Sequence, residues 1–103
     1  MRARIDIPRE QLATFCHRWQ ISEVALFGSV LRDDFGPNSD IDVLVRFQPQ
    51  ARPTLFDMVR MQDELQDILG RKVDLVSRRG IEMSRNYLRK KAILEAAEVV
   101  YGA

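Results

Sequence analysis

The stretch FGSVLRDDFGPNSDIDVLVRF, residues 27–47, decides the fold that we expect for this chain. The short apolar run 24–27 stops abruptly at Gly28-Ser29, as a strand does where it turns into a loop or helix that lets a ligand approach the backbone. A second apolar run, 41–47, follows the turn-rich residues 35–39. The sequence therefore predicts two strands, 21–27 and 41–47, joined by a connection that is suited to ligand contact.

Two carboxylates, Asp40 and Asp42, flank a single isoleucine at the head of the second run. Residues i and i+2 of a strand point to the same face, so these side chains are expected side by side, roughly 7 Å apart at Cα. Asp74 stands in the same way near the start of a third predicted strand, 72–77. Pairing of the second and third strands can bring the three carboxylates to one end of one sheet. Such hard oxygen ligands suit Mg²⁺, and two ions about 4 Å apart can hold both oxygens of an in-line displacement at phosphorus.

The Gly28-Ser29 turn supplies groups that complement a metal-bound phosphate. Glycine lets backbone N–H groups approach a triphosphate, and the Ser29 hydroxyl can donate a hydrogen bond. One or two helical turns are predicted over 30–34, and the positive end of such a helix would point at the anion. Arg32, one turn along, can add a charge-assisted contact.

Each of these signals also has a plain structural interpretation. Gly-Ser after a strand is common turn chemistry, and Asp-x-Asp beside a turn is often a solvated strand end or an Asx-turn. Asp74 alone reads as an exposed strand residue, and Arg32 alone as a surface charge. The conjunction of the three motifs, each at the end or head of a predicted strand, favours the phosphate-transfer interpretation.

Helical spacing and turn residues predict the remaining elements. Pro8 begins a helix that continues to Trp19, because apolar side chains recur on one face between them. Thr54 with Asp57 is close to a capping box, and the helix that follows is expected to end at Gly70. A last helix is predicted over 85–97 and a short terminal strand over 98–101. An edge strand there can pair with another copy of the chain, so a homo-oligomer stays open.

The whole-chain composition sets further limits. The 103 residues are enough for a single domain, 1–103, with one core. A net charge of +1 gives no overall argument for binding nucleic acid or membrane. A lone cysteine, Cys16, excludes an internal disulfide, and with no signal-peptide pattern we expect a cytoplasmic protein. Cys16 and His17 read as a core cysteine and a partly exposed histidine, although a ligand role is conceivable.

Three motifs together resemble a known family. Gly28-Ser29-x-x-Arg32, Ser39-Asp40-Ile41-Asp42 and Val73-Asp74-Leu75 are similar to the signature of the minimal nucleotidyltransferases (MNT) of the DNA polymerase beta superfamily. Members of this group are often encoded beside a HEPN-domain protein, and the similarity covers nearly the whole chain. The resemblance implies an α/β (α+β) fold with a small mixed β-sheet flanked by helices.

The resemblance also implies an activity, which is Mg²⁺-dependent transfer of AMP from ATP with release of pyrophosphate. In this chain Asp40, Asp42 and Asp74 would be catalytic and would ligate two Mg²⁺ ions, and Asp74 would assist deprotonation of the nucleophile. The nucleotide would be held by Gly28, Ser29, Arg32 and Ser39. Asp33-Asp34 follow the arginine where many relatives have glycine, which places added negative charge near the phosphate site.

The acceptor implied by the resemblance is a partner protein. MNT proteins of the better understood pairs act as antitoxins that adenylylate a tyrosine of a HEPN ribonuclease toxin. Two alternatives stay open, a binding module that neutralises the toxin by contact alone and a small-molecule transferase of the aminoglycoside type. Residues 71–91 hold eight of the 16 Lys and Arg but two of the 15 Asp and Glu, which makes this segment about +6 and the remainder about −5. Such a segment is either a solvated basic helix face or a face that meets an acidic partner or the RNA bound by that partner.

Overall fold

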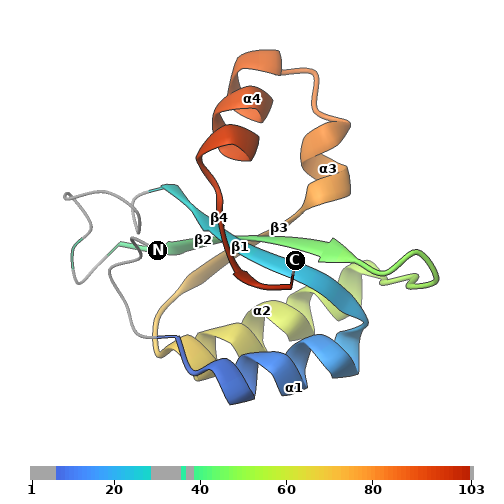
Figure 1. Cartoon of the computed structure of the whole chain (residues 1–103), viewed down its shortest axis with the longest axis vertical. Coiled ribbons are helices and arrows are strands. Elements are labelled where there is room, and N and C mark those ends of the chain that lie inside the picture. The colour runs from blue at the N-terminus through green and yellow to red at the C-terminus, as the bar shows by residue number, and fades with distance from the viewer. Residues whose placement is uncertain (1–6, 29–35, 37–38, 103) are drawn as a thin grey trace.

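A computed structural model describes residues 7–28, 36 and 39–102 and shows a four-stranded sheet with helices on both faces (Figure 1). The strand order is β3-β2-β1-β4, with a parallel β2–β3 pair and antiparallel β1–β2 and β1–β4 pairs. The sheet is therefore mixed, as the family resemblance implies. The elements in chain order are α1 (Arg9–Trp19), β1 (Ile21–Phe27), β2 (Ile41–Phe47), α2 (Leu55–Leu69), β3 (Val73–Ser77), α3 (Arg78–Glu82), α4 (Tyr87–Ala96) and β4 (Glu98–Tyr101).

The two strands that flank the Gly28-Ser29 turn have the bounds expected from the sequence, 21–27 and 41–47. β1 is buried from Val24 to Phe27 and ends at Gly28, which has a φ of 78°. L-amino acids with a Cβ rarely adopt this conformation, so glycine is the residue that lets the strand stop there. β2 lies between β1 and β3, and its apolar residues are buried except near the exposed Arg46.

The capping signals of α2 are confirmed, and α1 has a C-cap that was not predicted. Gln20 ends α1 in the left-handed conformation, and its backbone N–H donates to carbonyls of the last turn. The Thr54 hydroxyl accepts from the Asp57 N–H at 3.2 Å, and the Asp57 carboxylate accepts from the Thr54 N–H at 2.9 Å. Gly70, with a φ of 70°, ends α2. The α2 helix thus has both the start signal and the stop signal that its sequence carries.

Side chains of α2 cover the outer edge of β3. The backbone N–H groups of Val73 and Leu75 donate to the side-chain oxygens of Gln66 and Gln62, each at 3.2 Å. β3 is an edge strand, so these donors would otherwise face solvent or another strand. The glutamines fix the position of β3 against α2 and satisfy its free edge at the same time.

The carboxyl-terminal part of the chain differs from the sequence prediction in two respects. The five-residue helix α3 was not predicted, because a single buried apolar residue, Ile81, shows no periodicity. α4 begins at Tyr87 instead of residue 85, since Asn86 caps it by accepting from the Arg89 N–H at 3.0 Å. The terminal strand expected over 98–101 is present as β4. Across the described ranges, no helix has the length and apolar character needed to cross a membrane.

The two faces of the sheet carry cores of different size. α1 and α2 cover one face, and α3 and α4 stand over the other (Figure 1). The first core joins α1 and α2 to alternate residues of the strands; it includes Phe15 of α1, Met61 of α2 and Val43 of β2. The second is smaller and consists of Ala25, Phe27, Leu44, Ile81 and Ile93.

Candidate active site

Two of the three predicted carboxylates are neighbours across the parallel strand pair. Asp42 of β2 lies in register with Asp74 of β3, and the pair continues as Leu44 with Val76. Cross-strand partners point to the same side of a sheet, so both carboxylates share the face that carries α3 and α4. The crossover through α2 is what brings them together, because parallel strands cannot be joined by a tight turn. The expectation that pairing aligns these residues is confirmed.

Gly28 lies directly against Asp42. β1 and β2 pair Phe27 with Asp42, and the chain continues from Phe27 into Gly28. A Cβ atom placed on Gly28 would lie 2.2 Å from the Asp42 Oδ2 atom. Glycine is therefore required here both for its positive φ and for space. This close approach of backbone and carboxylate is the kind of setting in which a metal-bound phosphate can contact both.

Asp40 is placed differently from Asp42. β2 begins at Ile41, so Asp40 precedes the strand and its side chain is exposed. Strand alternation does not fix the direction of a residue outside the strand. The expected side-by-side arrangement of the two carboxylates therefore has no support from the strand register, although the residues are two positions apart.

Ser39 closes the turn that leads into β2. Its hydroxyl accepts from the Gly36 N–H at 3.1 Å, and its own N–H donates to the Gly36 carbonyl at 3.1 Å. The predicted nucleotide contacts Ser29 and Arg32 lie outside the described residues, as do the helical turns expected over 30–34. Of the predicted nucleotide-binding residues, the structure thus describes Gly28 and Ser39.

Arg71 is a residue of this site that the sequence did not reveal. Its guanidinium donates to the carbonyl oxygens of Gly36 and Ser39, the latter at 3.1 Å. The backbone carbonyl oxygen of the next residue, Lys72, accepts from the Ile41 N–H at 2.9 Å. The connection between α2 and β3 is therefore hydrogen-bonded to the turn that precedes Asp40. No pattern distinguishes this arginine from the other basic residues of the segment 71–91.

The chemistry of the three carboxylates fits a divalent cation, but their geometry is not that of a formed metal site. Asp40, Asp42 and Asp74 supply hard oxygen donors of the type that Mg²⁺ prefers. Among the residues that the structure describes, however, no three His, Cys, Asp or Glu side chains are close enough together to hold an ion. The backbone aligns two donors, and the carboxylates do not converge on one point.

Cys16 and His17 do not form a ligand pair. Cys16 is fully buried in the larger core, where burial raises the pKa of its thiol to about 12. His17, the next residue, is exposed. The interpretation of these residues as a core cysteine and a surface histidine is confirmed.

A cavity of about 730 Å³ lies at the opposite end of β2 from the carboxylates. It is formed where β2 and β3 end and α2 and α3 begin, and none of Gly28, Asp40, Asp42 and Asp74 lines it. We place the chemistry at the carboxylates because they are the groups that can bind metal and phosphate. Cavity size alone does not identify the site.

Comparison with known proteins shows the family of the chain. Residues 8–100 match the family model described as "Nucleotidyltransferase domain". A relative from Methanocaldococcus jannaschii, provisionally named a protein adenylyltransferase, is 36% identical over 90 residues, which are 87% of each chain.

Solved structures share the fold. A structure provisionally described as a minimal nucleotidyltransferase is 36% identical with a TM-score of 0.66, and the match covers 87% of this chain and 86% of the other. A tri-AMPylated Shewanella oneidensis HEPN toxin in complex with its MNT antitoxin matches at a TM-score of 0.60 and 18% identity, covering 91% and 69% of the two chains. At that identity the second likeness shows the fold alone. On the family match, the close relative and the aligned carboxylates, this chain belongs to the nucleotidyltransferase domain family, as one of the minimal nucleotidyltransferases of the DNA polymerase beta superfamily.

Proposed function

We propose that this chain transfers AMP from ATP to a partner protein, with Mg²⁺, and that it acts as an antitoxin on a tyrosine of a HEPN ribonuclease toxin. The observation that carries the proposal is the register pair of Asp42 and Asp74 with Gly28 packed against the first of them. The name of the Methanocaldococcus jannaschii relative supports AMP transfer to protein. The HEPN partner is supported by the fold shared with the Shewanella oneidensis antitoxin.

The three aspartates would hold the metal. Asp42 and Asp74 present oxygen donors from adjacent strands, and the exposed Asp40 precedes Asp42 by two residues. When bound, Mg²⁺ would neutralise charge on the triphosphate and lower the pKa of the acceptor hydroxyl. The β2–β3 ladder sets the backbone positions of Asp42 and Asp74, so rotation of these two side chains would bring their carboxylates toward a shared ion.

The turn residues would hold the triphosphate. Gly28 would offer its backbone to the phosphate beside the Asp42 carboxylate that packs against it, and Ser29 would add a hydroxyl donor. Arg32 would add a charge-assisted contact. Ser39 uses an oxygen lone pair within the turn, so its hydroxyl hydrogen is the group left to donate to the nucleotide.

The transfer step joins the tyrosine to the α-phosphorus. The phenolic oxygen forms a bond to that phosphorus while the bond from it to the oxygen bridging to the β-phosphorus breaks, and pyrophosphate leaves. The phenolic proton passes to the Asp74 carboxylate and then to water. Asp74 is exposed in the structure, so an acceptor from another protein can reach it.

The proposal is tested by incubating the chain with α-labelled ATP, Mg²⁺ and a HEPN-domain protein from the same organism, starting with any that a neighbouring gene encodes. We expect label on a tyrosine, identified by mass spectrometry, and a loss of at least about 100-fold in Asp42→Asn, because metal-based charge stabilisation is worth several kcal/mol. The matched control is Asp63→Asn, which removes an exposed carboxylate on α2, across the sheet from the site. Equal labelling by both variants would contradict the catalytic assignment.

A second candidate function is neutralisation of the toxin by contact alone. The described carboxylates do not form a ready metal site, which is what a binding module without catalysis would show. Under this alternative, Asp42→Asn would still protect against the toxin, and no modified tyrosine would be found with the wild-type chain. Protection that disappears together with the label would exclude it.

A further inference from the structure

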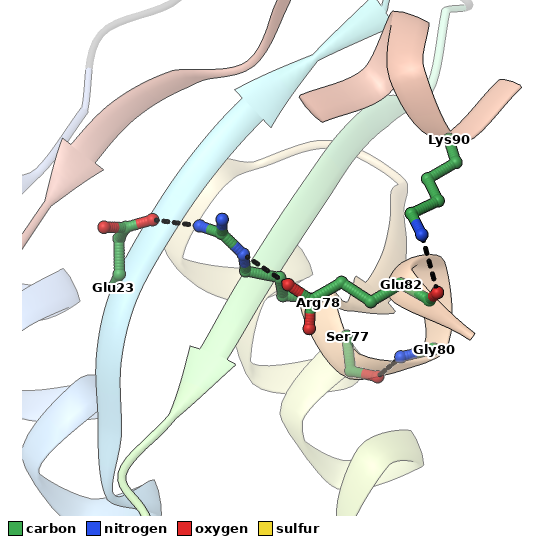
Figure 2. A network of polar contacts seen from close by, with 6 residues as sticks. All are labelled: Glu23, Ser77, Arg78, Gly80, Glu82 and Lys90. Carbon is green, nitrogen blue, oxygen red and sulfur yellow. Dashed lines mark hydrogen bonds and ion pairs between the residues drawn. The ribbon is translucent and has the colours of Figure 1, made fainter. Parts of the chain in front are cut away.

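The α3–α4 pair packs on the sheet through a small apolar core and carries a network of polar contacts. Figure 2 shows that Arg78, at the start of α3, reaches Glu23 of β1 at 3.7 Å and Glu82 at 3.3 Å. Lys90 of α4 donates to the Glu82 carbonyl at 3.0 Å, and the Ser77 hydroxyl caps α3 by accepting from the Gly80 N–H. The fully buried apolar residues of the two helices are only Ile81 and Ile93. The network connects α3 with α4 and with β1. Several large apolar side chains of the helix pair lie outside the core.

Three large apolar side chains of this pair are exposed. Met83 follows α3, and Tyr87 and Leu88 begin α4, with exposed fractions of 72%, 65% and 76%. Figure 1 shows that the α3–α4 connection lies on the side of these helices away from the sheet. Such a group of exposed large apolar residues is typical of a surface that another molecule covers.

Basic side chains surround these residues. Residues 78–96 contain six Lys or Arg and two Glu. Arg78 and Lys90 are engaged in the network of Figure 2, whereas four others are exposed and, among the residues that the structure describes, make no side-chain hydrogen bond or ion pair. We call Met83, Tyr87 and Leu88, together with these four basic residues, the α3–α4 surface; the four are Arg79, Arg85, Arg89 and Lys91.

We propose that the α3–α4 surface docks an acidic and apolar face of the protein that accepts AMP. Its charge selects an acidic partner, and its three apolar side chains supply the area that a specific protein contact needs. It stands on the same face of the sheet as Asp42 and Asp74, so a protein bound there lies over the face from which the carboxylates are reached. In identifying the docked protein with the acceptor, the inference rests on the proposed function.

Other occupants fit the surface less well. A second copy of the chain would place two basic surfaces against each other. An anionic membrane favours helices whose apolar and basic residues lie on opposite faces, whereas in α4 Leu88 directly adjoins Arg89 and the apolar residues do not form one stripe. Nucleic acid would contact the arginines through phosphate and leave Met83 and Leu88 without a counterpart.

The test compares matched substitutions on the two sides of the sheet. Leu88→Ser and Arg89→Glu alter the α3–α4 surface, and Phe56→Ser and Arg60→Glu alter exposed residues of α2 in the same way. All four side chains are exposed, so the variants should fold, which circular dichroism and thermal unfolding check. The probe is the HEPN-domain protein of the AMP-transfer test, with its Kd measured by calorimetry and its KM in the AMP-transfer assay.

We expect both α3–α4 variants to raise Kd and KM roughly tenfold with kcat unchanged, and the α2 variants to leave all three unchanged. Raising the salt concentration should weaken binding of the wild type more than that of Arg89→Glu. The surface assignment is overturned if the α3–α4 variants bind and transfer as the wild type does, or if only the α2 variants lose binding.

The outcomes separate this inference from the proposed function. Binding that depends on Leu88 and Arg89 without any AMP transfer supports the surface and contradicts the activity. Transfer that is indifferent to both residues supports the activity and contradicts the surface. Absence of both binding and transfer contradicts the surface and the activity. If the wild type binds anionic vesicles or RNA and Arg89→Glu does not, that ligand replaces the protein partner in the assignment.

Discussion

Alternate residues of β2 face surroundings of opposite character. Ile41, Val43 and Val45 are completely buried against α1 and α2. Asp42 and Leu44 belong to the other face, where α3 and α4 cover a smaller core and the carboxylates stay accessible. One strand thus contributes to stability with one set of side chains and to chemistry with the other. Stability and chemistry can therefore be altered separately, because the residues buried under α1 and α2 point away from the carboxylates.

The largest expected effect is on stability, from truncating one core residue on each face. Leu65 is fully buried between α2 and the sheet, whereas Ile93 belongs to the smaller core below α4. We expect Leu65→Ala to lower the free energy of unfolding by about 3–5 kcal/mol and Ile93→Ala by about 2 kcal/mol. Chemical denaturation measures both values. Hydrogen exchange should show that Ile93→Ala lowers the protection of α4 locally. Equal losses in the free energy of unfolding would mean that the two cores contribute equally to stability.

The next effect is smaller and concerns two glycines, at which backbone strain and loss of AMP transfer can be separated. Gly28 and Gly70 have similar positive φ values, 78° and 70°, but an added Cβ meets Asp42 at Gly28 and nothing within 4 Å at Gly70. Both Gly→Ala variants should lose about 1 kcal/mol of stability, because each forces alanine into the left-handed region. Only Gly28→Ala should also lose AMP transfer, by at least about 100-fold through displacement of the Asp42 carboxylate. Full activity in Gly28→Ala would show that the position of this carboxylate does not matter.

The smallest expected effect concerns Arg71, which connects the end of α2 to the turn before β2. Arg71→Ala removes the donors to the Gly36 and Ser39 carbonyls, and we expect transfer to fall about tenfold with a loss of stability of about 1 kcal/mol. Arg71→Lys should recover part of the activity, because it keeps the charge and some of the hydrogen bonding. Lys72→Ala is the control, since Lys72 contacts Ile41 through its backbone. Separate kcat and KM values for ATP would show whether the turn acts on binding or on the chemical step.

Features with local signals were predictable from the sequence. Gly28 marks the end of β1, and the Thr54–Asp57 capping box and Gly70 mark the ends of α2, because each signal acts through a backbone bond or dihedral of its own neighbourhood. The alignment of Asp42 with Asp74 followed from the expectation that their strands pair.

Features that depend on distant contacts were not predictable. α3 is too short to show a period, and its contacts with the sheet are the burial of Ile81 in the smaller core and the ion pair of Arg78 with Glu23. The role of Arg71 arises from carbonyls 32 and 35 residues away in the sequence. The strand pattern overstated the similarity of Asp40 to Asp42, because the strand begins between them.

The glutamine contacts along β3 limit how copies of this chain can join through their sheets. An open fibre formed by strand addition needs two complementary free edges on each copy. At β3 the N–H groups of Val73 and Leu75 already donate to Gln66 and Gln62, so an incoming strand would have to displace both side chains. The other edge of the described sheet is β4, where none of these glutamine contacts stands in the way of a second copy. Strand addition at the short parallel strand that carries Asp74 is therefore hindered by the same helix that positions it.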